Sequence, residues 1–392
     1  MRRRKRLKRD MALYLDNNGT TTPDPAVVEA MLPWLRDWHA NPHAEHAAGR
    51  RAAVAVENAR VAVASLIGAD AEDIYFTSGA TESNNLILQG LLGQGSSARR
   101  LLMSSIEHKS VLAIGTALAS SGVDVRVLNV ESTGRLNPQC VSEALKGPPF
   151  DGTTVIAVMH ANNEIGTVQP LQEIAALLNG TGAMLHVDAA QTCGKLPIDV
   201  ESLGVDFLGM SSHKMYGPAG IGAVYIAPDL RGRLRPLMFG GGQQDAIRPG
   251  TIPVFLVVGF GMASKLARER LAANSQHLNH CTAACVGRLI ELGIDHEWLG
   301  DPHHRLPGLI SLRLPGADAD RLLLSLSREL YAATGSACTS GEIRTSHVYR
   351  AIGLSGEEGA QVIRLGFSRY SAIGEAVRAA ELIAAAVHRV AA

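Results

Sequence analysis

Short apolar segments alternate with longer, more polar segments over most of this chain. Between Pro25 and Phe260, seven of the apolar segments have the length of β-strands: DIYFTS (73–78), RLLMSS (100–105), VDVRVLNV (123–130), TVIAVMH (154–160), AMLHVDA (183–189), VDFLGMSS (205–212) and GIGAVYIA (220–227). The stretches between them are long enough for helices. Such alternation is typical of a mostly parallel sheet with helices on both faces. The first part of the chain is therefore predicted to be an α/β domain.

The pattern changes after Phe260. A long helix-like segment (261–292) is followed by the strand-like segments GLISLRLP (308–315) and VIRLGFS (362–368), with further helical sequence around them. This order predicts a smaller α+β domain. We expect a basic arm at residues 1–12, a large domain at 13–262 and a small C-terminal domain at 263–392. Residues 13–24 could pack with the small domain.

Polar residues follow several of the strands predicted for the large domain. They are Thr77 to Thr81, Glu107 and His108, Asn162 and Asn163, Asp188 and Gln191, and Ser211, His213 and Lys214. In an open parallel sheet, ligands bind beyond the carboxyl ends of the strands. We therefore expect these residues to converge on one site.

The segment TSGATES (77–83) places glycine and hydroxyl residues before a helix that we expect to begin near Glu82. Backbone N–H groups at such a helix start favour an anion such as phosphate, although a simple helix N-cap would explain the segment as well. The segment is neither the Gly-x-Gly-x-x-Gly dinucleotide motif nor the phosphate loop ending in Gly-Lys-Ser/Thr. Nucleotide binding is thus not favoured.

Three side chains at these strand ends match the needs of pyridoxal phosphate (PLP). A lysine can form an imine, an aspartate can pair with the pyridine nitrogen, and a histidine can cover the ring. Taken singly, Lys214 could be a solvated lysine, Asp188 a turn cap, His108 a surface histidine and Asn163 a turn former. Their joint placement favours PLP.

Eight segments in a fixed order carry a family resemblance. They are YLDNNGTTTPDP (14–25), FTSGATESNN (76–85), IEHKSV (106–111), MHANNEIGTVQP (159–170), HVDAAQTCGKLPID (186–199), SSHKMYGPAGIGA (211–223), RPGTIPV (248–254) and TGSACTS (334–340). From Leu13 onward the chain resembles cysteine desulfurases of the NifS/IscS family, in the class V aminotransferase group. The resemblance implies the PLP fold type I, with a large domain built on a mostly parallel sheet and a smaller α+β C-terminal domain.

The resemblance also implies roles for the matching residues at the cofactor. Lys214 would hold PLP as an imine and shuttle the proton, His108 would cover the ring, and Asp188 would pair with the pyridine nitrogen. The remaining cofactor residues would be Gln191 and Asn163 near the ring oxygen and substrate, and Ala80, Thr81, Ser211 and His213 at the phosphate.

Two further matches concern the substrate and a second subunit. Arg364 would clamp the substrate carboxylate, for which a planar bidentate donor is well suited. Thr251 resembles a family residue that reaches the phosphate bound by the other subunit, which implies a homodimer.

Cys338 matches the family's persulfide cysteine. It lies among small residues in TGSACTSGE (334–342), and His108 could deprotonate its thiol, because a free thiol is largely protonated near neutral pH. One departure follows this segment, where relatives usually carry an acidic residue and proline and this chain has Arg344 and Thr345.

Five cysteines in no compact spacing argue for reduced thiols rather than a disulfide framework. Cys281 and Cys285 lie one helical turn apart near His277, and HANPHAEH (39–46) holds three histidines, so both are weak candidates for metal binding. His46 instead fits a family histidine, and we predict no metal site.

Charge is balanced overall, with 37 basic and 37 acidic residues, but it is unevenly distributed. The first ten residues, MRRRKRLKRD, could be a disordered tail or an upstream start before a native start at Met11, or a basic arm that binds nucleic acid. Elsewhere no nucleic-acid-binding composition is present. The longest apolar run, VFLVVGFGMAS (254–264), is too short to cross a bilayer, and no apolar signal region follows the arm, so a cytoplasmic protein is expected.

These observations predict a homodimeric PLP-dependent cysteine desulfurase. It would convert L-cysteine to L-alanine and place a persulfide on Cys338, which is passed to an acceptor protein in iron–sulfur assembly, tRNA thiolation or DNA phosphorothioation. The alternatives are a class V PLP aminotransferase or lyase with an incidental Cys338, and a non-enzymatic sulfur carrier or scaffold.

Overall fold

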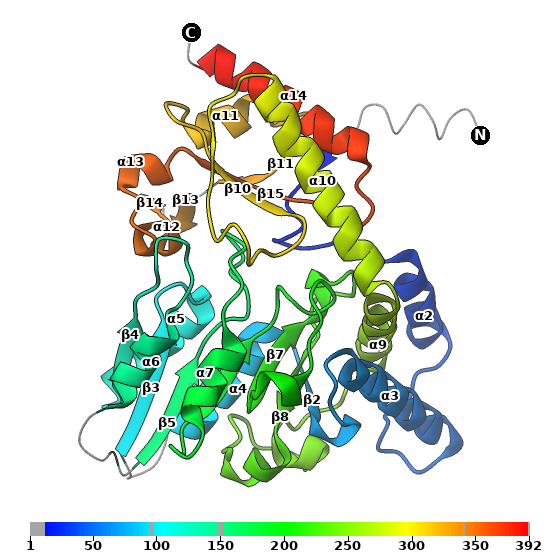
Figure 1. The fold of residues 1–392 in the computed structure, drawn as a ribbon. Helices are drawn as coiled ribbons and strands as arrows, with labels where there is room; N and C mark the ends of the chain where they lie inside the picture. Colours follow the sequence, from blue (N-terminus) through cyan, green and yellow to red (C-terminus); the bar gives the residue numbers. More distant parts are fainter. Residues whose placement is uncertain are drawn as a thin grey trace.

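The computed structural model describes residues 12–93, 98–146, 150, 152–334, 336–339 and 342–390. Figure 1 shows two layered parts, a larger sheet with its helices and a smaller sheet above it, joined by the long helices α9 (Val254–Glu269) and α10 (Leu271–Glu291). Of the predicted N-terminal arm (residues 1–12), residues 1–11 lie outside the described residues.

The larger sheet has seven strands in the order β2-β8-β7-β6-β5-β3-β4. These are β2 (Ile74–Thr77), β3 (Ala98–Ser104), β4 (Asp124–Leu128), β5 (Gly152–Ala157), β6 (Met184–Asp188), β7 (Phe207–Ser211) and β8 (Gly222–Ile226). Strand β8 runs opposite to the other six, which are parallel to one another, and this confirms the predicted mostly parallel sheet. The carboxyl ends of the other strands and the start of β8 therefore meet at one edge.

Helices cover both faces of this sheet. The helices of this part are α2 (Pro25–Arg36), which packs on α9, and α3 (Ala47–Leu66), α4 (Ala80–Leu92), α5 (Lys109–Ser120), α6 (Pro138–Leu145), α7 (Leu171–Leu178) and α8 (Val200–Leu203). Apolar residues of α4 and α5 pack on one face, and those of α3, α6, α7, α8 and α9 pack on the other. Because both faces are covered, the inner strands β6, β7 and β8 are buried at every position, whereas the edge strand β4 is partly exposed.

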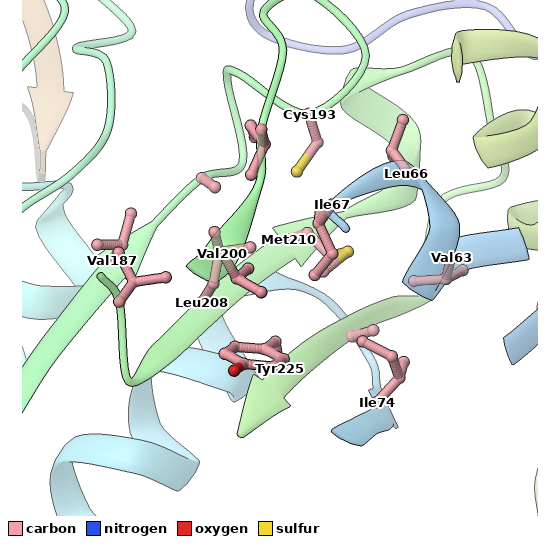
Figure 2. Packing of buried hydrophobic residues seen from close by; sticks show 14 of the residues in the cluster. Val63, Leu66, Ile67, Ile74, Val187, Cys193, Val200, Leu208, Met210 and Tyr225 are labelled. Atoms are coloured by element: carbon pink, nitrogen blue, oxygen red, sulfur yellow. The ribbon is translucent and has the colours of Figure 1, made fainter. Parts of the chain in front are cut away.

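The core beneath α3 illustrates this packing. Figure 2 shows Ile67, the residue after α3, beside Met210 of β7, and Val63 of α3 toward Ile74 of β2. Leu208 of β7 and Tyr225 of β8 belong to the same cluster. Val63, Ile67, Leu208 and Met210 are fully buried. Burying an apolar side chain of this size stabilises a fold by roughly 1.5–3 kcal/mol, so this layer holds β7 and the residues after it firmly in place.

The smaller part is built on a four-stranded antiparallel sheet of order β12-β15-β10-β9. Its strands are β9 (Glu297–Trp298), β10 (Leu309–Arg313), β12 (Ala333–Thr334) and β15 (Val362–Gly366), and its helices are α10, α11 (Ala319–Ser325), α12 (His347–Ala351), α13 (Gly356–Gly359) and α14 (Ile373–Val390). This arrangement confirms the predicted α+β part.

Two short strand pairs complete the described structure. Strand β1 (Leu13–Tyr14) pairs in parallel with β11 (Leu330–Tyr331), so the chain enters the large part by way of the small one. Strand β13 (Ser336–Thr339) pairs with β14 (Glu342–Thr345), and Cys338 stands opposite Ile343.

The helix-like segment 261–292 differs from the expected single element. The structure divides it at Arg270, whose φ of −111° and ψ of 8° separate α9 from α10. Helix α9 packs on α2 and α3, whereas α10 packs on α14. The two helices thus differ in the helices on which they pack. The predicted domain boundary at 262/263 lies inside α9. Across the described residues, no helix combines the length and apolarity that a membrane crossing requires.

Candidate active site

A cavity of about 390 Å³ opens at the edge of the large sheet where the polar strand ends meet. Its lining consists of Ser78 to Glu82, His108, Met159, Ala161, Asn163, Asp188, Ala190, Gln191, Ser211, His213, Lys214, Ala219 and Gly220. The structure thus brings together most of the residues predicted from the ends of β2, β3, β5, β6 and β7. The volume of the cavity lies within the range of small-molecule binding sites.

The start of α4 forms one wall of the cavity. Gly79 precedes the helix with a φ of 152°, a conformation that favours glycine, and among the described residues no side chain caps the helix. The free N–H groups of Ala80 and Thr81 and the positive end of the helix dipole therefore face this wall. Ser211 and His213 line the same cavity and add polar groups suited to an anion.

Glu82 of α4 forms an ion pair with Arg248, which lies in the loop before α9. Its carboxylate accepts hydrogen bonds of 2.7 and 3.3 Å from Nε and Nη2 of Arg248, and one of 2.6 Å from the Ser78 N–H. Burial alone would raise the pKa of Glu82, but these hydrogen bonds hold it below its usual value. Sequence reasoning did not find this ion pair, because nothing local relates Glu82 to Arg248.

Lys214 lies in a 3-10 turn, Ser212–Lys214, directly after β7. Its Nζ donates to the backbone carbonyls of Asn18 and Gly19 at 2.7 and 2.6 Å. Burial, followed by the charge of Arg364, lowers the pKa of Lys214 to about 8. Near neutral pH the amine is still mostly protonated, but its unprotonated, nucleophilic fraction is far larger than that of an ordinary lysine.

Asp188 belongs to a buried hydrogen-bond chain. Its Oδ2 accepts 2.8 Å from Nδ2 of Asn84, and its Oδ1 accepts 3.0 Å from the Ala190 N–H. The Oδ1 of Asn84 contacts Nε2 of His186 at 2.9 Å, and Nδ1 of His186 has no hydrogen-bond partner among the described residues. Burial lowers the pKa of His186 to about 4, so its ring is neutral and donates from Nε2. Asn84 was not predicted; a polar side chain on the buried face of α4 was the available signal.

His108 caps α5 with its ring. Its Nδ1 accepts from the Ser110 N–H at 3.2 Å and lies 2.8 Å from the Ser110 hydroxyl, so Nε2 is the ring nitrogen left for other contacts. Desolvation lowers the pKa of His108, and Lys214 and His347 lower it further, against the opposing charge of Asp188. The ring is therefore neutral near neutral pH, and because Nδ1 accepts from Ser110, its single proton lies on Nε2. Uptake of a second proton requires Nδ1 to give up its contact with Ser110.

Gln191 shares a hydrogen-bond acceptor with Lys214, the backbone carbonyl of Asn18. Gln191 donates from Nε2 to the Asn18 carbonyl at 3.0 Å, while its Oε1 accepts from Nδ2 of Asn18 at 3.1 Å and from Nζ of Lys195 at 3.4 Å. Lys195 is buried, and its burial lowers its pKa to about 7. Lys195 and Asn18 were not predicted, since only their neighbours on the folded chain reveal them.

Several predicted residues do not line the cavity. Among the strand-end residues, Thr77, Glu107 and Asn162 are buried outside its lining. The other three are Arg364, Thr251 and Cys338. Arg364, on β15, donates from Nη1 to the Asn163 carbonyl at 3.2 Å and so adjoins the cavity without lining it. Thr251 is exposed in the loop before α9, and Cys338 lies on β13, where the structure describes the strand but not the side chain.

The weak metal candidates gain no support. His46 caps α3 by accepting from the Gly49 N–H, and Cys281 lies 3.6 Å from Nε2 of His277, with the Ser371 carbonyl beside both. Within the described ranges, no group of three or more His, Cys, Asp or Glu side chains is placed to hold a metal ion.

The residues present fit PLP. An uncapped helix start with Ser211 and His213 suits a phosphate, and the lysine amine of depressed pKa suits covalent attachment to an aldehyde. The Asp188 carboxylate, fixed at both oxygens, suits a pyridine nitrogen.

Comparisons with known proteins agree with this geometry. Residues 13–377 match the family model for the class V aminotransferases. The cysteine desulfurase IscS of Rickettsia prowazekii is 38% identical over 382 residues, which cover 97% of this chain and 92% of that protein. The chain belongs to the NifS/IscS family of cysteine desulfurases. This family lies within the class V group, whose enzymes depend on PLP, and this chain is therefore a PLP-dependent enzyme.

Solved structures of this family share the fold. A NifS-like protein superposes with a TM-score of 0.87 at 31% identity, covering 97% of this chain and 99% of that one. The structure titled SspA in complex with cysteine gives a TM-score of 0.80 at 34% identity, over 92% of this chain and 99% of that one. The fold predicted from the family resemblance is thus confirmed.

Proposed function

We propose that this enzyme transfers the sulfur of L-cysteine to its own Cys338. The carbon–sulfur bond of the substrate breaks, the sulfur joins the Cys338 sulfur as a persulfide, and the remaining three-carbon unit is protonated to L-alanine. The observation that supports this best is the meeting of Lys214, Asp188, His108 and an anion-binding helix start in one cavity. A solved relative bound to cysteine supports the choice of substrate.

PLP, when bound, withdraws electrons from the substrate's α-carbon and so weakens the bonds around it. In our proposal Lys214 attaches the cofactor and later moves a proton at the substrate carbon. Asp188 holds the pyridine nitrogen, and its own position is set by Asn84. Ala80, Thr81, Ser211 and His213 hold the phosphate, while Gln191 and Asn163 contact the ring oxygen and the substrate.

His108 is proposed to cover the ring and to accept the proton of the Cys338 thiol. The base of the hairpin formed by β13 and β14 adjoins His108, because Nε2 of His347, just after β14, donates to the Glu107 carbonyl at 2.9 Å. Proton acceptance matters because the thiolate, not the thiol, is the nucleophile. At the end of β14, the hydroxyl of Thr345, where relatives usually have proline, donates to the Gly356 carbonyl at 3.0 Å.

Arg364 is proposed to bind the substrate carboxylate. It lies at the junction of the large and small sheets, on β15, and already contacts the backbone of the cavity residue Asn163. A guanidinium is suited to this role because it stays charged and can bind both carboxylate oxygens.

A homodimer is proposed from Thr251. This residue is exposed and does not line the cavity of its own chain, yet its loop is fixed to the phosphate wall by the Arg248–Glu82 ion pair. In a dimer Thr251 would reach the phosphate of the partner. Sedimentation of a fully active, cofactor-loaded monomer would contradict this proposal.

The division into residues 13–262 and 263–392, the sulfur-acceptor protein and a cytoplasmic location are also proposals. The four cysteines whose side chains the structure describes, Cys140, Cys193, Cys281 and Cys285, are free, as a reducing compartment would require. Iron–sulfur assembly, tRNA thiolation and DNA phosphorothioation are the acceptor pathways that we consider.

The reaction can be tested with the purified cofactor-loaded protein and L-cysteine. We expect L-alanine to form and Cys338 to gain one sulfur atom, seen by mass spectrometry after alkylation. Cys338→Ser should still perturb the cofactor spectrum on binding L-cysteine but should form almost no alanine. Cys140→Ser is the matched control and should behave as the parent. Alanine formation by Cys338→Ser at the parent rate would instead indicate the aminotransferase or lyase alternative.

A further inference from the structure

The guanidinium of Arg364 is already paired with a carboxylate of this chain. Its Nη2 donates to Oδ1 of Asp16 at 2.7 Å, with exposed side-chain fractions of 12% for Arg364 and 32% for Asp16. Its Nη1 is directed to the Asn163 carbonyl, and its buried Nε has no hydrogen-bond partner among the described residues. Arg364 thus has one anionic partner, which contacts it through a single oxygen.

The backbone places Asp16 beside Arg364. Asp16 forms a parallel β-bridge with Gly366, at the end of the strand that carries Arg364. Both the backbone N–H and Nδ2 of Asn17 donate to the Gly366 carbonyl, at 3.2 and 2.8 Å. Together with the 2.6 Å bond from the Gly366 N–H to the Leu15 carbonyl, three hydrogen bonds that do not involve the Asp16 carboxylate therefore hold the backbone around Asp16 at this position.

The same carboxylate adjoins the segment that binds Lys214. A Cβ built on Gly19 would lie 2.5 Å from Oδ2 of Asp16, and the Gly19 carbonyl accepts from Nζ of Lys214. Asp16 therefore contacts Arg364 on one side and adjoins the residue that binds Lys214 on the other. Glycine at residue 19 leaves space for the Asp16 carboxylate.

We propose that Asp16 competes with the substrate carboxylate for Arg364, so that an amino acid binds only when Nη2 exchanges one carboxylate for the other. This inference rests on the proposed role of Arg364 in substrate binding. The contact of Asp16 is single and partly exposed, whereas an incoming carboxylate can engage two nitrogens of the guanidinium, which is the stronger arrangement. Asp16 lowers the affinity for every carboxylate ligand, and it returns to Arg364 when the product leaves.

The competition predicts a gain of affinity when Asp16 loses its charge. Binding of L-alanine and of L-alaninamide, which lacks the carboxylate, can be measured by titration calorimetry of the cofactor-loaded protein. In Asp16→Asn we expect L-alanine to bind roughly three- to tenfold more tightly, as removal of a partly exposed ion pair allows, with L-alaninamide unchanged. Asp16→Glu, which keeps the charge, should bind L-alanine no more tightly than the parent. Asp37→Asn, an exposed acid at the end of α2, controls for the change in net charge.

Arg364→Ala separates this inference from the proposed function. If Arg364 is the carboxylate clamp, this variant should bind L-alanine and L-alaninamide alike, and adding Asp16→Asn to it should have no effect. Equal or weaker L-alanine binding by Asp16→Asn, with discrimination lost in Arg364→Ala, would overturn the competition and leave the clamp intact. If Arg364→Ala still prefers L-alanine, the clamp itself is wrong and the competition with it. Should Asp16→Asn fold poorly, Asp16→Ser gives the same comparison.

Discussion

Asn84 joins His186 to Asp188 by two hydrogen bonds of opposite sense. Its Nδ2 donates to Oδ2 of Asp188 at 2.8 Å, and its Oδ1 accepts from Nε2 of His186 at 2.9 Å. The amide cannot be reversed, because Asp188 needs a donor and the neutral His186 presents one. This chain fixes the carboxylate that we propose for the pyridine nitrogen of the cofactor.

Asn84→Ala should therefore weaken PLP retention. We expect the dissociation constant of PLP to rise about tenfold, because a buried hydrogen bond to a charged group contributes about 1.5–3 kcal/mol and part of this is expressed in binding. The measurement is equilibrium dialysis of the protein against PLP. Asn85→Ala is the matched control, since the Asn85 side chain bonds only the Thr81 carbonyl on the outer side of α4. Similar PLP affinity in Asn84→Ala and Asn85→Ala would show that the hydrogen bonds of Asn84 do not contribute to PLP binding.

The Arg248–Glu82 ion pair should make stability depend on pH in the acid range. The pKa of Glu82 is held below its ordinary value of 4.5, so the pair stabilises the folded protein above that pH. This contribution is lost as the pH falls through the lowered pKa of the folded protein. Arg248→Ala should reduce the free energy of unfolding by about 1–3 kcal/mol at pH 7.

Urea unfolding of the parent and Arg248→Ala at several pH values checks this expectation. The difference between the two proteins should be constant from pH 6 to 7 and should shrink at pH values well below about 4, where Glu82 is protonated in both states. Arg126→Ala is a suitable control, because Arg126 pairs with Asp124 in a more exposed position. A difference that persists undiminished at acid pH would show that Arg248 acts through packing rather than through its charge.

Lys214 should take up PLP at a rate that rises with pH. Only the unprotonated amine is nucleophilic, and burial beside Arg364 lowers the pKa of Lys214 to about 8. Stopped-flow absorbance of cofactor-free protein mixed with PLP should give a rate that increases up to about pH 8 and then levels off. Lys214→Ala should bind PLP without the covalent linkage, so no lysine adduct should remain after borohydride reduction.

A comparison of two variants would show whether PLP is attached to Lys195 instead of Lys214. Lys195 is the second buried lysine near the cavity, with a pKa lowered to about 7. If Lys214→Ala still formed a reducible adduct and Lys195→Met did not, Lys195 would be the attachment residue.

Removal of residues 1–10 should leave catalysis unchanged, because the cavity is built from later parts of the chain. If the arm binds nucleic acid, all such affinity should reside in it, and seven basic residues meeting phosphates would give a salt slope of roughly −6 on duplex DNA. Fluorescence anisotropy with labelled DNA across a salt series measures this slope for the full and truncated proteins. Equal affinity of both proteins would eliminate the tether, and a large loss of turnover would show that the arm belongs to the fold.

Much of the architecture and chemistry could be predicted from the sequence. The seven apolar segments between Pro25 and Phe260 correspond to β2 to β8, because strands buried on both faces must be apolar at successive positions. The polar residues that end these strands, such as Asp188 and Lys214, meet at one cavity because parallel strands share one carboxyl edge. Local pattern and strand direction were sufficient for this result.

The tertiary structure alone decided which distant side chains pair. Asp16 and Arg364 are 348 residues apart, and Glu82 and Arg248 are 166 apart, so no local periodicity relates them. The break between α9 and α10 at Arg270 likewise could not be predicted, because no glycine or proline lies there. The two helices pack on different neighbours, which accounts for the break. Periodicity reports burial along one element, whereas ion pairs depend on the register and packing between elements, which exist only once the chain has folded.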